Sequence, residues 1–194
     1  ALEGLPPASA AAALAPLTPK SVVDKWREVH EPIVSYWREL ERAAMSACNG
    51  VDCAAGPFEY LNCDGLIVCR LPSGRPLVYR GMKVSRDERG RPGLSYMSRE
   101  SARRGVPERT YGGKLAENAI QAMCRDLMAK ALVEAEREGL CPVLSIHDEL
   151  ICQVPAADAK SALELLHAVM CEVPPWAQGM PIAAAGHVCA RYTK

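Results

Sequence analysis

The part of the sequence that most constrains the fold is a polar tripeptide between two short apolar runs. The runs cover residues 142–146 and 150–155, and each is bounded on its outer side by proline. Short apolar runs with such boundaries predict β-strands. The residues between them are His147, Asp148 and Glu149. The pattern therefore predicts a β-hairpin that presents an imidazole and two carboxylates at its tip.

The two adjacent carboxylates need compensation, because closely spaced charges are costly without solvent, a cation or hydrogen bonds. The tip is therefore either a solvated turn or a metal site. An acidic pair suits Mg²⁺, which usually takes one or two protein carboxylates and keeps water or phosphate oxygens at its other positions. A two-metal site for phosphoryl transfer would need a further carboxylate from elsewhere in the fold. The tripeptide by itself leaves both readings open.

The strongest helix pattern in the chain lies directly before this hairpin, from Leu115 to about Gly139. The segment contains no proline and many alanines, and its final glycine can end a helix. Asn118, Gln121 and Arg125 have helical spacing and are expected on one face. Another face is expected to carry an apolar stripe of Ala116, Ile120, Met123, Leu127 and Ala131.

An amphipathic helical pattern follows an alanine- and proline-rich stretch at the amino-terminal end. Residues 1–20 have few charges and are expected to form a linker, and residues 21–194 are expected to form one folded unit. Apolar residues recur at helical spacing from Ser21 to about Ala47. Pro32 interrupts them and predicts a kink or the first turn of a second helix.

Strand-like runs and a further helix complete the expected elements. Runs at 58–61, 66–71 and 77–79, separated by turn residues, predict an antiparallel meander. A helix is expected over 156–172 and an edge strand over 180–185. Helices and hairpins are mixed without a repeated strand–helix–strand order, which favours an α+β fold with an antiparallel sheet.

Charge is distributed unevenly along a chain that is neutral as a whole. The 23 Lys and Arg residues balance the 23 Asp and Glu residues, which argues against binding to nucleic acid by bulk charge alone. Residues 83–114, which include Arg109, nevertheless carry nine basic and four acidic side chains. This stretch is either a solvated loop or a surface that contacts phosphates.

The nine cysteines are odd in number, form no CxxC pair and follow no secretory signal. We therefore expect them to be reduced and to serve as small core residues in a cytoplasmic protein. No apolar run in the sequence is long enough to span a membrane.

The helix and hairpin patterns belong to a longer series of motifs. The series comprises Trp26-Arg27-x-x-His30-x-x-Ile33-Val34-x-x-Trp37, Leu71-Pro72-Ser73-Gly74-Arg75-Pro76-Leu77-Val78-Tyr79, Thr110-Tyr111-Gly112-Gly113-Lys114-Leu115-x-Glu117-Asn118-x-x-Gln121-Ala122, His147-Asp148-Glu149, Pro181-Ile182-Ala183-Ala184 and Arg191-Tyr192-x-Lys194. In this order and spacing the motifs resemble the C-terminal palm of family A DNA polymerases, in particular the bacteriophage-type branch. The resemblance covers about residues 20–194. It implies a palm-type antiparallel sheet whose hairpin, called motif C, packs against long helices.

The resemblance also implies an activity and roles for the tip residues. The activity is DNA-directed DNA polymerisation by two-metal catalysis, with primer–template DNA and deoxynucleoside triphosphates as partners. Asp148 would bind the catalytic Mg²⁺ pair, and Glu149 would assist less directly. His147 would sit near the primer terminus.

Nucleic-acid contacts are implied for the helix before the hairpin and for the basic stretch. Gln121 would reach the minor-groove side of the primer–template duplex, with Asn118 and Arg125 as neighbours. The spacing from Asn118 to Gln121 is one residue shorter than in bacterial DNA polymerase I, which leaves the contact of Asn118 open. Lys114, which belongs to the motif, and Arg109, which is cationic, are further candidates for contact with the DNA.

Two parts of a family A polymerase are not found in this sequence: motif A, which carries the second essential aspartate, and motif B, whose Lys and Tyr hold the incoming nucleotide. We therefore expect the C-terminal palm portion, starting just after motif B and inactive without the missing part. The remaining N-terminal segment or a second copy would then be its partner, and a carboxylate outside this chain would complete the Mg²⁺ site. Two alternatives stay open: a non-catalytic palm-like module that binds duplex DNA or a partner chain, and a small α+β domain with a solvated turn.

Overall fold

The computed structural model describes residues 18–86 and 90–192, in which helices and short strands are mixed. The helical segments are α2 (Pro19–Val29), α3 (Glu31–Cys48), α4 (Arg99–Arg104), α5 (Gly112–Arg137), η1 (Ala156–Asp158), α6 (Ala159–Cys171) and η2 (Pro175–Ala177). The strands are β1 (Cys53–Ala55), β2 (Phe58–Cys63), β3 (Leu66–Arg70), β4 (Pro76–Tyr79), β5 (Lys83–Arg86), β6 (Pro92–Tyr96), β7 (Glu108–Thr110), β8 (Pro142–Ile146) and β9 (Glu149–Cys152). All the strand pairs are antiparallel, which confirms the α+β class. No helix within these ranges has both the length and the apolar character needed to cross a membrane.

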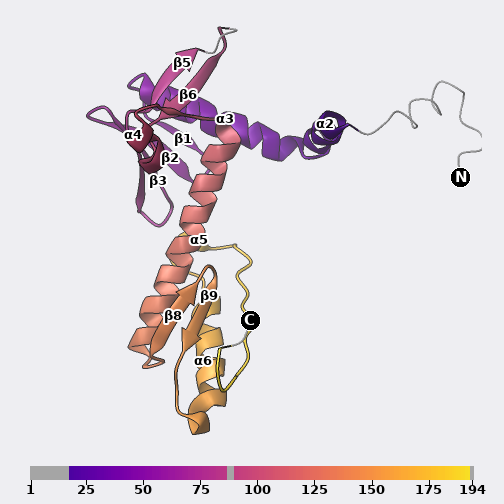
Figure 1. The fold of residues 1–194 in the computed structure, drawn as a ribbon, viewed down its shortest axis with the longest axis vertical. Coiled ribbons are helices and arrows are strands. Elements are labelled where there is room, and N and C mark those ends of the chain that lie inside the picture. Colours follow the sequence, from indigo (N-terminus) through magenta and orange to yellow (C-terminus); the bar gives the residue numbers. More distant parts are fainter. Residues whose placement is uncertain (1–17, 87–89, 193–194) are drawn as a thin grey trace, which may run out of the picture.

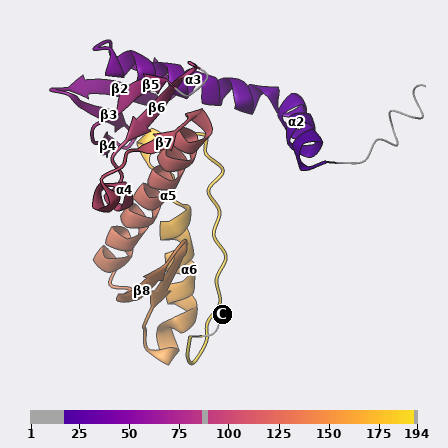
Figure 2. The ribbon, with the colours of Figure 1, turned by 45° about the horizontal axis from the view of Figure 1, so that its top comes forward.

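The long helix α5 connects two regions of the molecule (Figures 1 and 2). The sheet region consists of α3, the β1-β2-β3-β4 sheet, the β5-β6-β7 sheet and the amino-terminal half of α5. The hairpin region consists of the carboxy-terminal half of α5, the β8–β9 hairpin and α6. Each region has its own cluster of buried apolar side chains.

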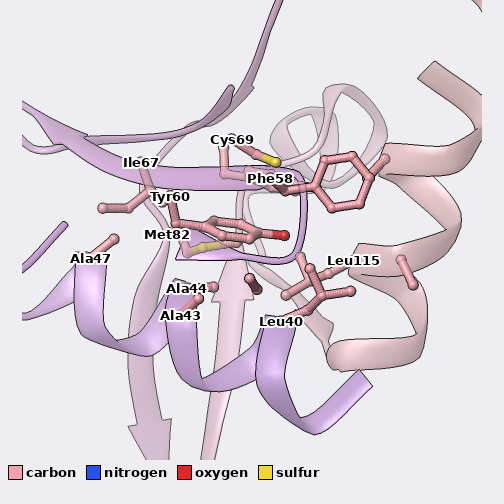
Figure 3. Packing of buried hydrophobic residues seen from close by; sticks show 14 of the residues in the cluster. Leu40, Ala43, Ala44, Ala47, Phe58, Tyr60, Ile67, Cys69, Met82 and Leu115 are labelled. Atoms are coloured by element: carbon pink, nitrogen blue, oxygen red, sulfur yellow. The ribbon is translucent and has the colours of Figure 1, made fainter. Parts of the chain in front are cut away.

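The core of the sheet region lies where α3 covers the β1–β4 sheet (Figure 3). Alternation along β2 turns Phe58 and Tyr60 inward. Small residues on α3, such as Ala43 and Ala44, let the helix approach the sheet closely enough to bury Leu40 completely. This close packing removes large apolar side chains from water and stabilises the region.

A glycine at the start of α5 brings this helix against α3. A Cβ atom on Gly112 would lie 1.8 Å from the carbonyl oxygen of Trp37, so only glycine fits at this position. The Gly112 amide also donates a hydrogen bond to Oε2 of Glu41 at 3.2 Å. Gly112, one of the motif residues, therefore has a packing role: it sets the distance between two helices of the core.

A polar cluster fastens the β3–β4 turn to α5 near the point where the two regions meet. Asp126 accepts hydrogen bonds from Ser73 Oγ and Arg75 Nε, both at 2.5 Å. A third bond runs from Arg75 Nη2 to the carbonyl oxygen of Ala122 at 2.8 Å. The Asp126 side chain is only 12% exposed, so its charge depends on these partners more than a surface carboxylate would. The cluster thereby fixes the turn on the helix.

The predicted amino-terminal helices are confirmed, and α3 begins beside Pro32 as expected. The linker predicted over residues 1–20 lies outside the described residues, apart from its last three positions. Thr18 caps α2 and forms a capping box with Ser21, and residues 19 and 20 already belong to the helix. A threonine cap followed by proline favours a helix start at this position, which the linker prediction did not take into account.

One of the two interpretations of the basic stretch, the solvated loop, is wrong, and so is the predicted carboxy-terminal edge strand. The basic stretch 83–114 is not a plain loop, because it folds into β5, β6, α4 and β7. β6 and β7 pair although α4 lies between them in the chain, and such pairing is not visible in local composition. Residues 180–185 do not form the expected edge strand. The amides of Met180 and Ile182 instead make local turn bonds to residues 177 and 180, and Pro181 between them has no amide proton to donate.

The apolar stripe predicted on α5 is wrong at Ile120, which is 53% exposed. The helix packs through Ala116, which the stripe included, and through Leu115 and Ala119, which it did not; all three are buried. Small side chains on this face allow α5 to approach α3, and the larger isoleucine is left on the outside. Ala131, at the other end of the stripe, is buried as predicted.

All nine cysteines are free thiols, and they differ widely in exposure. Cys69 is buried in the sheet-region core, where burial raises the pKa of its thiol to about 11. Four others are exposed: Cys63, Cys124, Cys141 and Cys189. The prediction that the cysteines serve as small core residues therefore holds for Cys69 and fails for these four.

Candidate active site

The predicted hairpin is present, and its turn is tighter than the sequence suggested. β8 and β9 pair antiparallel with Ile146 opposite Glu149, so His147 and Asp148 form a two-residue turn. His147 has a φ of 52°, which lies in the left-handed region that such hairpin turns use. Glu149 is the first residue of β9 and not part of the turn.

Exposure and hydrogen bonding distinguish the two carboxylates. His147 and Asp148 are exposed, whereas Glu149 is half-buried. The hydroxyl of Tyr192 donates a hydrogen bond to Oε2 of Glu149 at 3.2 Å. Desolvation and the neighbouring Glu149 carboxylate raise the pKa of Tyr192, so the phenol stays protonated and keeps donating at neutral pH. Asp148 is thus the more accessible acid, and Glu149 is the more restrained one.

The hairpin rests on α5 and α6 through a small apolar cluster. In this cluster, Leu150 of β9 is buried together with Ala131, Ala135, Leu140 and Val169. Apolar packing on one side of the hairpin therefore holds the turn in place while its polar residues face solvent.

The direction of β8 places the turn beside the middle of α5. The strand has five residues and rises about 17 Å, the length of about eleven residues of helix. Because β8 runs back along α5 from the end of that helix, the turn lies beside the middle of α5 (Figures 1 and 2). The acids are therefore on the same stretch of the molecule as Arg125 and, about one helical turn further, Gln121.

The three residues predicted to share a face of α5 have different surroundings. Gln121 and Arg125 are exposed, so both are accessible to a large ligand. Asn118 is half-buried, and its Nδ2 donates a hydrogen bond to the Tyr79 hydroxyl at 3.4 Å. Burial raises the pKa of Tyr79 to about 12, so the phenol keeps its proton. Asn118 is engaged with the sheet region, and Gln121 and Arg125 remain as the accessible pair.

The two other predicted DNA-binding residues lie at the amino-terminal end of α5, away from the turn. Lys114 forms an ion pair with Glu117 at 2.8 Å, and this hydrogen bond is the main reason that the pKa of Lys114 is raised. Arg109 is exposed on β7, just before the helix. From Lys114 to Arg125 the helix rises about 16 Å. The structure therefore brings Asp148, Glu149 and His147 together and leaves Lys114 and Arg109 at a distance.

The carboxylates of the hairpin fit part of a magnesium site. Across residues 18–86 and 90–192, no group of three or more His, Cys, Asp or Glu side chains is arranged to hold a metal ion. Asp148 and Glu149 are adjacent and supply two carboxylates, which is the number that Mg²⁺ usually takes from a protein. The donor set therefore fits one side of a two-metal site, and the other side would need a further acid.

No role was predicted from the sequence for Tyr192, the hydrogen-bond partner of Glu149. The residue belongs to the carboxy-terminal motif Arg191-Tyr192-x-Lys194, which is the one signal that could have marked it. Its contact spans 43 positions along the chain, and no local pattern predicts a pairing over that separation.

Comparison with known proteins agrees with the motif series. A DNA polymerase of Bacillus phage SP02 is 36% identical to the chain over 177 residues, an alignment that covers 89% of the chain. The chain is a homologue of a phage DNA polymerase. It spans 27% of the length of that phage polymerase. Only about a tenth of the chain lies outside the alignment. The aligned part of the chain therefore includes α5 and the hairpin.

No family model matches the chain, and no solved structure matches it. The phage polymerase supports the resemblance to phage-type DNA polymerases that the motifs suggested.

Proposed function

We propose that this chain forms the C-terminal palm part of a family A DNA polymerase and that, with the rest of the enzyme, it adds deoxynucleotides to a primer under the direction of a template. One observation carries the proposal: the alignment with a phage DNA polymerase spans a hairpin in which the turn residues His147 and Asp148 and the first strand residue Glu149 have the order expected of motif C. The exposed Asp148 at the apex of a packed hairpin agrees with a group that must reach a metal ion and substrates.

The proposed reaction is an attack of the primer 3′-hydroxyl on the α-phosphate of a deoxynucleoside triphosphate, with pyrophosphate leaving. Mg²⁺ bound here would supply positive charge that favours the deprotonated hydroxyl and offsets charge on the phosphate oxygens. Asp148 would hold the ion through its accessible carboxylate. Glu149 would contribute less directly, since Tyr192 restrains one of its oxygens. The second essential acid would come from a segment outside this chain.

The remaining tip and helix residues would position the DNA. His147 would donate a hydrogen bond to a phosphate or sugar oxygen near the primer terminus. Gln121 has an amide that can donate to and accept from base edges in the minor groove, and Arg125 can donate to the adjacent backbone. Because the turn lies level with the middle of α5, one duplex end could touch these residues and the acids together.

Exposed apolar residues on the hairpin favour a protein partner. Val143 and Leu144 on β8 are 54% and 48% exposed, which is unusual for apolar residues in the middle of a strand. We expect the remaining part of the polymerase to cover this surface and to bring the second carboxylate to the turn. Self-association of the chain is the other way in which the surface would become buried.

The proposal is tested by joining this chain to its upstream polymerase segments and measuring primer extension with Mg²⁺. Asp148→Asn keeps the size of the side chain and removes its charge, and we expect extension to fall by about a thousandfold or more. The matched control is Asp158→Asn, because Asp158 is an exposed acid in the same region that lies away from the turn.

Extension that survives Asp148→Asn would exclude the assignment of this carboxylate. If the complete protein also binds duplex DNA without extending primers, the non-catalytic palm-like module becomes the better description. If duplex binding fails even at low salt, both descriptions fail and a solvated turn remains.

A further inference from the structure

One face of the β5-β6-β7 sheet carries cations that the hairpin site does not use. Ser95 on β6 pairs with Lys83 on one side and with Arg109 on the other, and directly paired residues point to the same face of a sheet. The neighbouring β6 residues Leu94 and Tyr96 belong to the core cluster and lie on the opposite face. Lys83 and Arg109 therefore flank Ser95 on the face that points away from the core, and the serine between them is itself buried, with 6% exposure.

The side chain of Arg109 is laid across the neighbouring strand. A Cβ atom on Gly93 would lie 2.6 Å from Nη2 of Arg109, so the guanidinium occupies the space that a side chain would need. Gly93 stands two positions before Ser95 on β6, and it is opposite Ser85 of β5. The glycine thus makes room for a flat cation on the sheet. A side chain that is already restrained loses less conformational entropy when it binds a ligand.

The charges on this face are available. Lys83 and Arg109 are exposed, and in the part of the chain that the structure describes neither forms an ion pair. The short helix α4, which lies between β6 and β7 in the chain, also has two exposed arginines, Arg99 and Arg103, one turn apart. Lys83 and Arg109 are therefore unneutralised cations on a chain with no net charge.

The position of the sheet allows one duplex to reach it and the hairpin. β7 ends at Thr110, and α5 begins at Gly112, so the basic face lies at the amino-terminal end of α5. From Gly112 to Gln121 the helix rises about 14 Å, which is about four base-pair steps of duplex DNA. A duplex that meets Gln121 would thus have its backbone within a few base pairs of the sheet.

We propose that Lys83 and Arg109, on the outward face of this sheet, bind the phosphate backbone of duplex DNA as a second anchor, separate from the primer terminus. The identity of the ligand rests on the proposed polymerase function, since an acidic protein surface would match the same charge. Arg109 and Lys83 are two strands apart, about 10 Å, so each would contact its own phosphate. Such contacts hold the duplex without reading its sequence.

The test is a binding measurement with the full chain and a labelled duplex of about 30 base pairs whose ends are closed by loops, so that it offers no primer terminus. The double variant Lys83→Ala/Arg109→Ala is compared with the double variant Lys25→Ala/Arg137→Ala. The control pair removes the same charge from α2 and from the end of α5, and both control side chains are 68% exposed. Thermal melting of every variant shows whether it is folded.

We expect the sheet variant to bind at least about tenfold more weakly at 0.1 M salt, and the slope of log Kd against log salt to fall by about two. The control should bind like the unmodified chain. Equal loss in both variants would overturn the proposal in favour of bulk charge, and no loss in either would overturn it outright. Tighter binding of polyglutamate than of DNA at matched charge would overturn it in favour of an acidic protein partner.

Asp148→Asn separates this proposal from the polymerase function. Binding of the closed duplex should be unchanged in that variant, because the duplex has no primer terminus. Loss of extension with intact binding supports both proposals. If Asp148→Asn extends primers normally while Lys83→Ala/Arg109→Ala binds the duplex more weakly, the catalytic role of Asp148 is excluded and the DNA-binding role of the basic face is still supported.

Discussion

The sheet region and the hairpin region use α5 in different ways. Along the first half of α5, Leu115, Ala116 and Ala119 are buried in a core that also contains Tyr60 and Leu40. The cluster of the hairpin region has fewer members. These are Ala131 and Ala135 on the second half of α5, and Leu140, Leu150 and Val169 beyond it.

The sheet region therefore supplies most of the packing, and the hairpin region carries the candidate active site. The sheet region packs large side chains between a helix and a sheet, whereas the hairpin region leaves Val143 and Leu144 exposed while it presents Asp148 at its turn. Hydrophobic burial scales with the apolar area removed from water, so the first region contributes most of the stability of the chain. The candidate site is carried by the part that depends more on a partner.

The largest effect is expected where α3 and α5 meet. Gly112→Ala would place a Cβ atom 1.8 Å from the Trp37 carbonyl oxygen, so the two helices must separate. We expect the free energy of unfolding to fall by about 3 kcal/mol or more, measured by urea denaturation.

The matched control is Gly139→Ala, which follows α5 in the hairpin region. A Cβ atom there meets open space, and only the positive φ of 75° opposes it, so a loss of about 1 kcal/mol is expected. Similar losses in the two variants would mean that the sheet region tolerates expansion and does not dominate stability.

A smaller effect is expected from alkaline pH, and it acts mainly on the sheet region. Burial raises the pKa of Tyr79 to about 12 and that of Cys69 to about 11, and it also raises the pKa of Tyr60. In the unfolded chain these groups lose their protons near pH 10 for tyrosine and 8.5 for cysteine. Above those values the unfolded state binds fewer protons than the folded one, so stability falls as pH rises. Below about pH 8.5 the contribution is fully retained.

Denaturation between pH 8 and pH 11 measures this loss, which is about 1.4 kcal/mol per pH unit for each group that ionises only on unfolding. Tyr79→Phe removes one such group and should make the decline above pH 10 shallower. In the hairpin region, burial also raises the pKa of Cys152. An unchanged decline in Tyr79→Phe would show that Tyr79 is not shielded from solvent.

The smallest effect is expected at the hydrogen bond between Tyr192 and Glu149. Tyr192→Phe removes the donor from an exposed bond, so the free energy of unfolding should change by less than about 1 kcal/mol. Amide hydrogen exchange in β8 and β9 should nevertheless become faster. Tyr111→Phe is the control, because Tyr111 is 62% exposed in the sheet region. If exchange in the hairpin is equally fast in both variants, the contact does not restrain the turn.

Some elements could be predicted from the sequence because their signals are local. The hairpin around Asp148 is bounded by prolines, and the segment before Gly139 is rich in helix-forming residues. The β5-β6-β7 sheet could not be predicted in this way. Its strands are short, and the charged residues in them, such as Lys83 and Arg109, are typical of a loop. Only their pairing with Ser95 shows that they lie in strands.

The candidate site likewise has features that local sequence predicts and features that depend on distant contacts. The sequence by itself determined the order of His147, Asp148 and Glu149 in a hairpin, the helix that precedes them and the motif series shared with phage-type polymerases. Only the tertiary structure decided that Glu149 lies in the strand beside Tyr192 and that Asn118 is engaged with Tyr79. It also decided that Arg109 lies flat across Gly93. The physical reason is that turn and helix preferences act over a few residues, whereas these contacts depend on packing between segments far apart in the chain.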